Sequence, residues 1–258
     1  MSRTNPKPTG PHPWFQVQPG SGARIRLFCF PYAGGSSAIF RPWSRALPRE
    51  IELVPALLPG REFKLREPAY TRVEPLVETL TREIFPFLDK PFAFFGHSMG
   101  AIISFELARR LRTERRVEPD HVFVSGRRSP RVPRRDPYIH ELPQAEFIAE
   151  LERLNGTPRE VLEHKELMEM LDPMLRADFA LCHAYTYVPG EPLRCPITVF
   201  GGMQDETAPR EEVEAWCTET TGGCRVHFLE GDHFFINQQH TAILEIIQRN
   251  LVAHIHQF

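Results

Sequence analysis

The chain has 258 residues, 41% of them apolar, and its 31 Lys and Arg nearly balance its 33 Asp and Glu, so the formal net charge is -2. This length suits one domain whose core needs no metal or disulfide to hold it together. The balanced charge argues against a protein that binds nucleic acid through bulk positive charge.

The beginning of the chain has the composition of a tail. Residues 1–22 contain five prolines and three glycines and lack the apolar stretch of a secretory signal. We expect residues 1–22 to be flexible and residues 23–258 to form a single domain. No run of 18 apolar residues occurs, so no transmembrane helix is expected and no membrane partner is predicted.

Short apolar runs bounded by turn residues alternate with longer amphipathic segments, which is the pattern of parallel strands joined by helices. The alternation predicts the α/β class, with a doubly wound, mostly parallel sheet flanked by helices. The expected strands are 24–30, 51–57, 92–95, 121–125, 197–200 and 225–229.

Three helices are expected around this sheet. The first covers 73–84, where apolar residues repeat at helical spacing and Thr71 with Glu74 forms a capping box. The second follows Ser98 and extends to Arg112. The third closes the chain and places its apolar residues on one face; they are Ile243, Ile246, Ile247 and Leu251.

One connection breaks the alternation, because about 70 residues separate the fourth and fifth strands, which is too long for a loop. Helical patterns occur within it at 144–154, 161–171 and 173–185. We interpret residues 127–190 as a helical lid insertion over the carboxyl edge of the sheet, where open α/β folds bind ligands. The alternative is that these helices only enlarge the core.

The cysteines are odd in number, widely spaced and without a CxxC pair, so the pattern predicts neither a disulfide framework nor a zinc site. A reducing cytoplasm fits this usage best, and we expect no metal and no cofactor. The cysteines are Cys29, Cys182, Cys195, Cys217 and Cys224.

The third expected strand runs directly into Gly96-His97-Ser98-Met99-Gly100, and a helical pattern follows. This is a GxSxG nucleophile elbow in the context of strand, sharp turn and helix that it requires. The elbow predicts that Ser98 is the nucleophile of an α/β hydrolase. The alternative is a serine in an ordinary glycine turn.

A serine hydroxyl needs a base to take its proton, and the base needs an orienting acid. His233 follows the last strand and precedes the final helix, where the Ser–acid–His chain order of α/β hydrolases puts the base. His97 is the alternative, although a residue adjacent to the nucleophile in an elbow points its side chain away.

The acid should lie in a loop after a strand. Asp205 comes five residues after the end of the fifth strand and is the expected acid. Its neighbour Glu206 and the histidine's neighbour Asp232 are the alternatives. The loop after the fourth strand, 125–128, is the other usual place for this acid and contains no carboxylate.

Two backbone N–H groups should hold the oxyanion of a tetrahedral intermediate. Met99 follows the nucleophile at a helix start, where the helix dipole favours negative charge. The second donor is expected in Pro-Tyr-Ala-Gly-Gly-Ser after the first strand, with Ala33 preferred and Tyr32 the alternative. The alternative that this turn binds phosphate would require the pattern GxxxxGK[ST], which the chain lacks.

These residues resemble a known family, the type II thioesterases of polyketide and nonribosomal peptide synthesis, close relatives of medium-chain fatty acid thioesterases. The GxSxG motif marks only the superfamily, whereas LPGRE and LRADF are specific to this branch. The matching stretches are FCFPYAGGS (28–36), LLPGRE (57–62), FFGHSMGA (94–101), DPMLRADF (172–179), CPITVFGG (195–202) and GDHFF (231–235).

The resemblance implies an α/β hydrolase with a mobile helical lid that hydrolyses acyl groups from the phosphopantetheine arms of carrier proteins. It implies Ser98, Asp205 and His233 as the catalytic triad. The position of the acid resembles that of stand-alone editing enzymes, and we expect a monomer that removes aberrant short acyl units. The alternatives are a medium-chain fatty acyl thioesterase, a general carboxylesterase, a chain-releasing thioesterase or cyclase, and a noncatalytic carrier-binding module.

Five arginines lie within nine residues at the start of the insertion, and carrier proteins are generally acidic around their phosphopantetheine. These arginines are therefore a candidate carrier-docking surface. A solvated basic loop is the alternative. The five are Arg127, Arg128, Arg131, Arg134 and Arg135.

Overall fold

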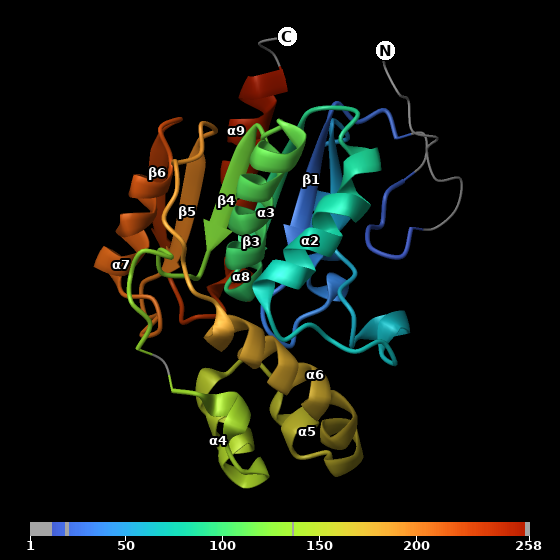
Figure 1. Cartoon of the computed structure of the whole chain (residues 1–258), viewed down its shortest axis with the longest axis vertical. Helices are drawn as coiled ribbons and strands as arrows, with labels where there is room; N and C mark the ends of the chain where they lie inside the picture. Colours follow the sequence, from blue (N-terminus) through green and yellow to red (C-terminus); the bar gives the residue numbers. More distant parts are fainter. Residues whose placement is uncertain (1–11, 19–20, 136, 256–258) are drawn as a thin grey trace.

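Six parallel strands form one sheet in the described part of the chain, in the order β2-β1-β3-β4-β5-β6 (Figure 1). The computed structural model describes residues 12–18, 21–135 and 137–255. Each strand lies within two residues of an expected one, and the predicted α/β fold is confirmed. The strands are β1 (Ile25–Phe30), β2 (Ile51–Pro55), β3 (Phe92–His97), β4 (His121–Ser125), β5 (Ile197–Gly202) and β6 (Cys224–Leu229).

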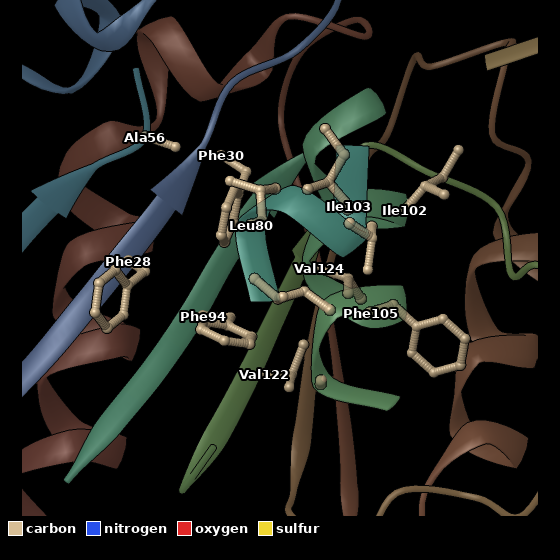
Figure 2. Packing of buried hydrophobic residues seen from close by; sticks show 14 of the residues in the cluster. Phe28, Phe30, Ala56, Leu80, Phe94, Ile102, Ile103, Phe105, Val122 and Val124 are labelled. Atoms are coloured by element: carbon tan, nitrogen blue, oxygen red, sulfur yellow. The ribbon is translucent and has the colours of Figure 1, made fainter. Parts of the chain in front are cut away.

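Both faces of the sheet are covered, so the central strands are buried along their whole length. Alternate side chains enter two separate cores. Phe28, Phe94 and Val122 point into the larger core (Figure 2), whereas Leu27 and Phe95 enter the core on the opposite face. The period of two along each strand therefore divides the apolar residues between the two layers of helices.

Three of the helices that flank the sheet, α2, α3 and α9, lie where the sequence pattern expects them. The short helices α1, α7 and α8 were not expected. Helices α2 and α3 pack on the larger core, and α1 and α9 pack on the other face. The expected capping box is wrong: Arg72 caps α2 and no side-chain capping bond forms. These helices are α1 (Trp43–Ala46), α2 (Val73–Ile84), α3 (Met99–Arg115), α7 (Arg210–Glu214), α8 (Phe235–Gln238) and α9 (His240–Ile255).

The long connection between β4 and β5 is helical and lies beyond the carboxyl ends of the strands (Figure 1). It contains α4 (Gln144–Leu154), α5 (Arg159–Leu162) and α6 (Lys165–Ala184), which share a third hydrophobic core. The two helices expected on either side of residue 172 are one, because α6 continues through Pro173. Buried residues on both sides of this proline, Met168 and Leu175, hold the helix on a single surface.

The short 3-10 turns join these elements. They are η1 (Ser37–Phe40), η2 (Glu62–Lys64), η3 (Phe85–Phe87), η4 (Ile139–Glu141) and η5 (Ala215–Glu219). No helix among the described residues is long and apolar enough to cross a membrane.

Part of the expected flexible tail is packed. In the described segment 12–18, Phe15 is fully buried, and it forms an isolated antiparallel bridge with Ala56 at the end of β2. Its ring stands edge-on to Phe28 of the larger core. The structure differs from the expectation here because two aromatic residues, Trp14 and Phe15, outweigh the surrounding prolines. Residues 1–11 and 19–20 lie outside the described residues.

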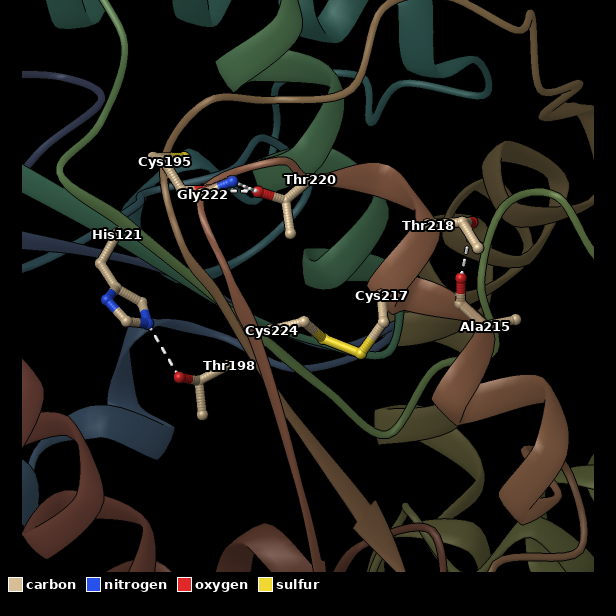
Figure 3. The surroundings of a disulfide bond; sticks show 9 residues. All are labelled: His121, Cys195, Thr198, Ala215, Cys217, Thr218, Thr220, Gly222 and Cys224. Carbon is tan, nitrogen blue, oxygen red and sulfur yellow. Dashed lines mark hydrogen bonds between the residues drawn. A yellow bond between two sulfur atoms is a disulfide. The ribbon is translucent and has the colours of Figure 1, made fainter.

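Cys217 and Cys224 form a disulfide that joins η5 to the start of β6 (Figure 3). The expectation of no disulfide is wrong at this pair. Sequence spacing alone does not show that the chain turns back between these cysteines, at Gly222 and Gly223, and brings them together. Cys29, Cys182 and Cys195 are buried and do not take part in the disulfide.

Candidate functional site

Ser98 is the single residue between the end of β3 and the start of α3. A methyl group at Gly96 would lie 2.0 Å from the carbonyl oxygen of Gly100. A methyl group at Gly100 would lie 2.0 Å from the carbonyl oxygen of Phe30. Both positions therefore require glycine, and the expected elbow of strand, turn and helix is present.

Three side chains from distant parts of the chain meet at this elbow. His233 Nε2 lies 2.9 Å from Ser98 Oγ, and His233 Nδ1 lies 2.8 Å from Asp205 Oδ2. A carboxylate only accepts, so Nδ1 carries the ring proton and Nε2 accepts from the hydroxyl. The structure thus brings together the serine, histidine and aspartate that the sequence singled out, with the imidazole in the form that can take a proton.

Thr207 holds the aspartate in place. Its backbone N–H and its hydroxyl both donate to Asp205 Oδ1, at 2.9 and 2.7 Å, which leaves Oδ2 for the imidazole. Burial acts to raise the pKa of Asp205, but the hydrogen bonds and charge from His233 and Thr207 outweigh it and lower the pKa below its ordinary value. The carboxylate therefore stays ionised.

The two alternative acids lie elsewhere. Glu206 is exposed. Asp232 Oδ1 accepts from the backbone N–H of Phe234, and its Oδ2 accepts from Asn155 Nδ2 at 3.1 Å. Asp232 therefore joins the loop before the histidine to the C-terminal cap of α4 and does not orient the imidazole.

His97 is not a second base. Its ring is fully buried, and Nε2 donates to the backbone carbonyl of His233 at 2.9 Å. Nδ1 then accepts from Ser125 Oγ, also at 2.9 Å. Burial and the nearby His233 lower the pKa of His97 to about 3. This histidine fixes the loop that carries His233, a contact that the sequence pattern did not reveal.

Of the two expected oxyanion donors, Met99 directly follows the serine, and Ala33 lines the same cavity as Ser98. Met99 is the first residue of α3, so its N–H has no acceptor within the helix. Ala33 follows β1 in a turn closed by the bond from Gly35 N–H to the carbonyl of Tyr32, at 2.9 Å. Gly34, at the third position of that turn, has φ of 78°, which favours glycine. Among the described residues no acceptor is found for the N–H of Ala33.

A cavity of about 120 Å³ opens onto Ser98 and His233. Leu151 and Leu154 of α4 and Leu175 and Phe179 of α6 form much of its wall, and the wall is therefore mainly apolar. The helical insertion thus covers the reacting groups and supplies the surface that an acyl chain would contact.

Most of the five clustered arginines have partners within the chain. Arg128 and Arg135 pair with Glu212 at 3.9 and 3.6 Å, and Arg131 pairs with Glu219. The guanidinium of Arg134 lies over the ring of Tyr138. Arg127 lines the catalytic cavity. The side chain of Arg135 is nevertheless 77% exposed, so this loop still presents positive charge to solvent.

Among the described residues no group of three or more His, Cys, Asp or Glu could hold a metal ion.

The elbow, the hydrogen-bonded Ser98, His233 and Asp205, and the parallel sheet define an α/β hydrolase. Residues 25–251 match the thioesterase domain family. The chain belongs to this thioesterase family.

Known proteins similar to this chain span nearly the same length. It is 45% identical over 239 residues to the gramicidin S biosynthesis protein GrsT of Aneurinibacillus migulanus, which covers 92% of this chain and 93% of GrsT. It is 44% identical over 236 residues to the linear gramicidin dehydrogenase LgrE of Brevibacillus parabrevis, covering 90% of each chain. The structure of the type II thioesterase BorB from the borrelidin biosynthetic cluster superimposes with a TM-score of 0.87, at 33% identity, covering 95% of this chain and 100% of that one.

Proposed function

We propose that this protein is a stand-alone type II thioesterase that removes aberrant short acyl units from the phosphopantetheine arms of carrier proteins in polyketide or nonribosomal peptide synthesis. The observation that carries the proposal is the hydrogen-bonded array of Ser98, His233 and Asp205 beneath the helical insertion. The names of GrsT and BorB, which refer to gramicidin S and borrelidin biosynthesis, support the biosynthetic setting.

In the proposed mechanism the thioester carbonyl carbon lies next to Ser98 Oγ. His233 Nε2 accepts the hydroxyl proton as Oγ attacks, and the N–H groups of Met99 and Ala33 stabilise the oxyanion. When the intermediate collapses, the C–S bond breaks and the imidazolium protonates the departing thiolate. Asp205 stabilises the imidazolium and keeps its orientation.

The acyl serine is then hydrolysed in the same way. His233 takes a proton from water, the hydroxide attacks the ester carbonyl, and the same two N–H groups hold the second oxyanion. The Ser98 Oγ leaves with the proton from the imidazolium, and the free acid is released. The cycle consumes one water molecule and returns the enzyme to its starting protonation state.

One relative, LgrE, is named as a dehydrogenase, but the site in this chain suits a different reaction. A hydroxyl, an imidazole and a carboxylate bonded in sequence perform nucleophilic attack and proton transfer, not hydride transfer. Hydrolysis is therefore the proposed reaction.

A hydrolysis panel on one purified carrier, loaded in turn with acetyl, propionyl, malonyl and longer acyl groups, tests the proposal. We expect wild-type protein to release the short acyl groups as free acids. Ser98→Ala should lower the rate by about 10⁴-fold or more. Full activity in Ser98→Ala would dismiss the mechanism, and preference for simple oxygen esters of matched chain length would favour a general carboxylesterase.

The proposed partner is an acyl or peptidyl carrier protein that approaches the arginines of residues 127–135. The exposed side chain of Arg135 supports this, because acidic carrier surfaces would be attracted to it. We propose that the protein acts as a monomer in the cytoplasm, where carrier-dependent synthesis takes place.

A further inference from the structure

Arg61 and Asp178 form a buried ion pair beside the catalytic elbow. Arg61 Nη2 lies 2.6 Å from Asp178 Oδ1 and Nη1 lies 2.9 Å from Oδ2, and the two residues are 4% and 2% exposed. Arg61 precedes η2 and Asp178 lies in α6, so the pair joins the core of the fold to the helical insertion. Buried pairs of this kind are costly to desolvate and are weak evidence for stability alone.

Arg61 Nε donates to the carbonyl of Pro59 at 3.2 Å, and two further hydrogen bonds of the pair go to a single turn. The backbone N–H of Gly34 donates to Asp178 Oδ2 at 2.8 Å, and Arg61 Nη1 donates to the carbonyl of Gly35 at 2.7 Å. This is the turn that carries Ala33. The next residue of the motif, Glu62, accepts from Ser37 Oγ at 2.7 Å and so holds the end of the same loop.

These bonds fix the peptide groups next to Ala33. With the Gly34 N–H directed at Asp178, the peptide plane between Ala33 and Gly34 has one orientation. Gly34 also packs closely on α6, since a methyl group there would lie 2.7 Å from Leu175 Cδ2. The ion pair and this packing together set where the Ala33 N–H lies relative to the elbow.

We propose that Arg61 and Asp178 are positioning residues that hold the oxyanion-binding turn in its catalytic geometry. Because Asp178 lies in α6, they also couple the position of this turn to the position of α6. The inference rests on the proposed function, in which the Ala33 N–H binds the oxyanion. Neither side chain is required to touch the substrate. A shift of α6 would therefore move a wall of the cavity and the oxyanion donor together.

The test separates positioning from stability by replacing both charges at once. The double variant Arg61→Met/Asp178→Leu leaves no unpaired buried charge, so it should fold. The matched control is Arg26→Met/Glu52→Leu, at a second buried ion pair between β1 and β2, where Arg26 Nε and Glu52 Oε2 are 2.9 Å apart. The single variant Asp178→Asn keeps the side-chain shape and adds a second measurement.

The readouts are kcat and KM on a small acyl-N-acetylcysteamine thioester, the inhibition constant of an alkyl boronic acid, and the melting temperature. We expect kcat of the Arg61/Asp178 double variant to fall about 10²- to 10³-fold with KM within about threefold, as for loss of one oxyanion donor. Boronate affinity, which depends on the same donors, should fall with it. Asp178→Asn should show the same pattern to a smaller degree.

The Arg26/Glu52 control should keep wild-type kcat and boronate affinity in its folded fraction. The inference is overturned if the Arg61/Asp178 double variant retains wild-type kcat, if only KM changes, or if the control loses as much kcat. Wild-type protein and Ser98→Ala are assayed alongside. Failure of the wild type to hydrolyse the thioester, or full activity in Ser98→Ala, would instead overturn the proposed function.

Discussion

Ser98 adopts φ of 53° and ψ of -109°, a backbone conformation that residues other than glycine rarely occupy. The surrounding structure imposes it. The Ser98 N–H donates to the carbonyl of Ser125 at 2.8 Å, and the two glycines of the elbow allow strand and helix to approach. The strain therefore keeps the hydroxyl at the edge of the sheet, where His233 meets it.

The two aspartates near His233 provide a matched comparison. Asp205→Asn should lower kcat by about 10⁴-fold, because an amide in place of the carboxylate favours the wrong imidazole tautomer. Asp232→Asn should change kcat much less, since Asp232 bonds to Phe234 and Asn155 and not to the imidazole. Steady-state kinetics on a small thioester measures both, and equal losses in the two variants would contradict the assignment of Asp205.

The buried ring of His97 makes stability sensitive to acid. Its pKa is lowered to about 3 in the folded protein, whereas the unfolded chain takes up the proton near pH 6.5. Between these values the unfolded state binds more protons, so the free energy of unfolding should fall by up to about 1.4 kcal/mol for each unit that the pH drops.

Urea unfolding of wild type and His97→Gln between pH 7 and pH 5 checks this. The variant should lose that part of the pH dependence, whatever its stability at pH 7. Identical slopes in the two proteins would show that His97 does not cause the acid sensitivity.

The residues that the sequence could predict are those with a local signal. Ser98 lies in a GxSxG pattern, and His233 and Asp205 each follow a strand in the order that the fold requires. The contact from His97 to the His233 carbonyl and the bonds from Thr207 to Asp205 had no such signal. The His97 contact joins segments that approach each other only after the sheet has formed, whereas the Thr207 bonds depend on the conformation of the single loop that also holds Asp205.

Among the elements, the strands were the most predictable because burial on both faces gives continuous apolar runs bounded by turns. The continuation of α6 through Pro173 was not predictable from local rules, which favour a break at proline. Contacts in the third core on both sides of the proline decide the outcome. The cap of α2 was also mispredicted, because the residue that precedes the helix is Arg72 and not Thr71.

The disulfide between Cys217 and Cys224 should stabilise the edge of the sheet. The loop it closes is short, with a sequence separation of 7. Chain-entropy arguments give about 2.5 kcal/mol for such a loop. Cys217→Ser should lower the free energy of unfolding by about that amount, as measured by urea unfolding without reductant.

Reductant supplies the control for this prediction. Dithiothreitol should lower the stability of the wild type to that of Cys217→Ser and leave the variant unchanged. Equal stability of the two proteins without reductant would mean that the bond does not form or does not contribute.

At the scale of the whole molecule, charge should distinguish carrier-bound from small substrates. Arg135→Glu reverses a largely exposed charge on the proposed docking loop. We expect it to lower kcat/KM for an acyl carrier by about tenfold through slower association, and to leave a small acyl thioester within about twofold.

Arg116→Glu is the matched control, because Arg116 is exposed at the opposite end of α3 from the elbow. It should leave both substrates unaffected. Equal loss on the carrier and the small thioester in Arg135→Glu would show that the loop acts on the active site and not on docking.

The third core, shared by α4, α5 and α6, is separate from the two cores of the sheet, yet its helices wall the cavity above Ser98. The reacting groups and much of the cavity wall thus come from different parts of the polypeptide. Selection can therefore change the cavity to suit an acyl chain of another length by exchanging residues of the insertion, while the reacting groups stay as they are. Grafting this segment between related enzymes should accordingly transfer their acyl preference. The graft must retain Asp178, whose carboxylate accepts a hydrogen bond from the Gly34 N–H.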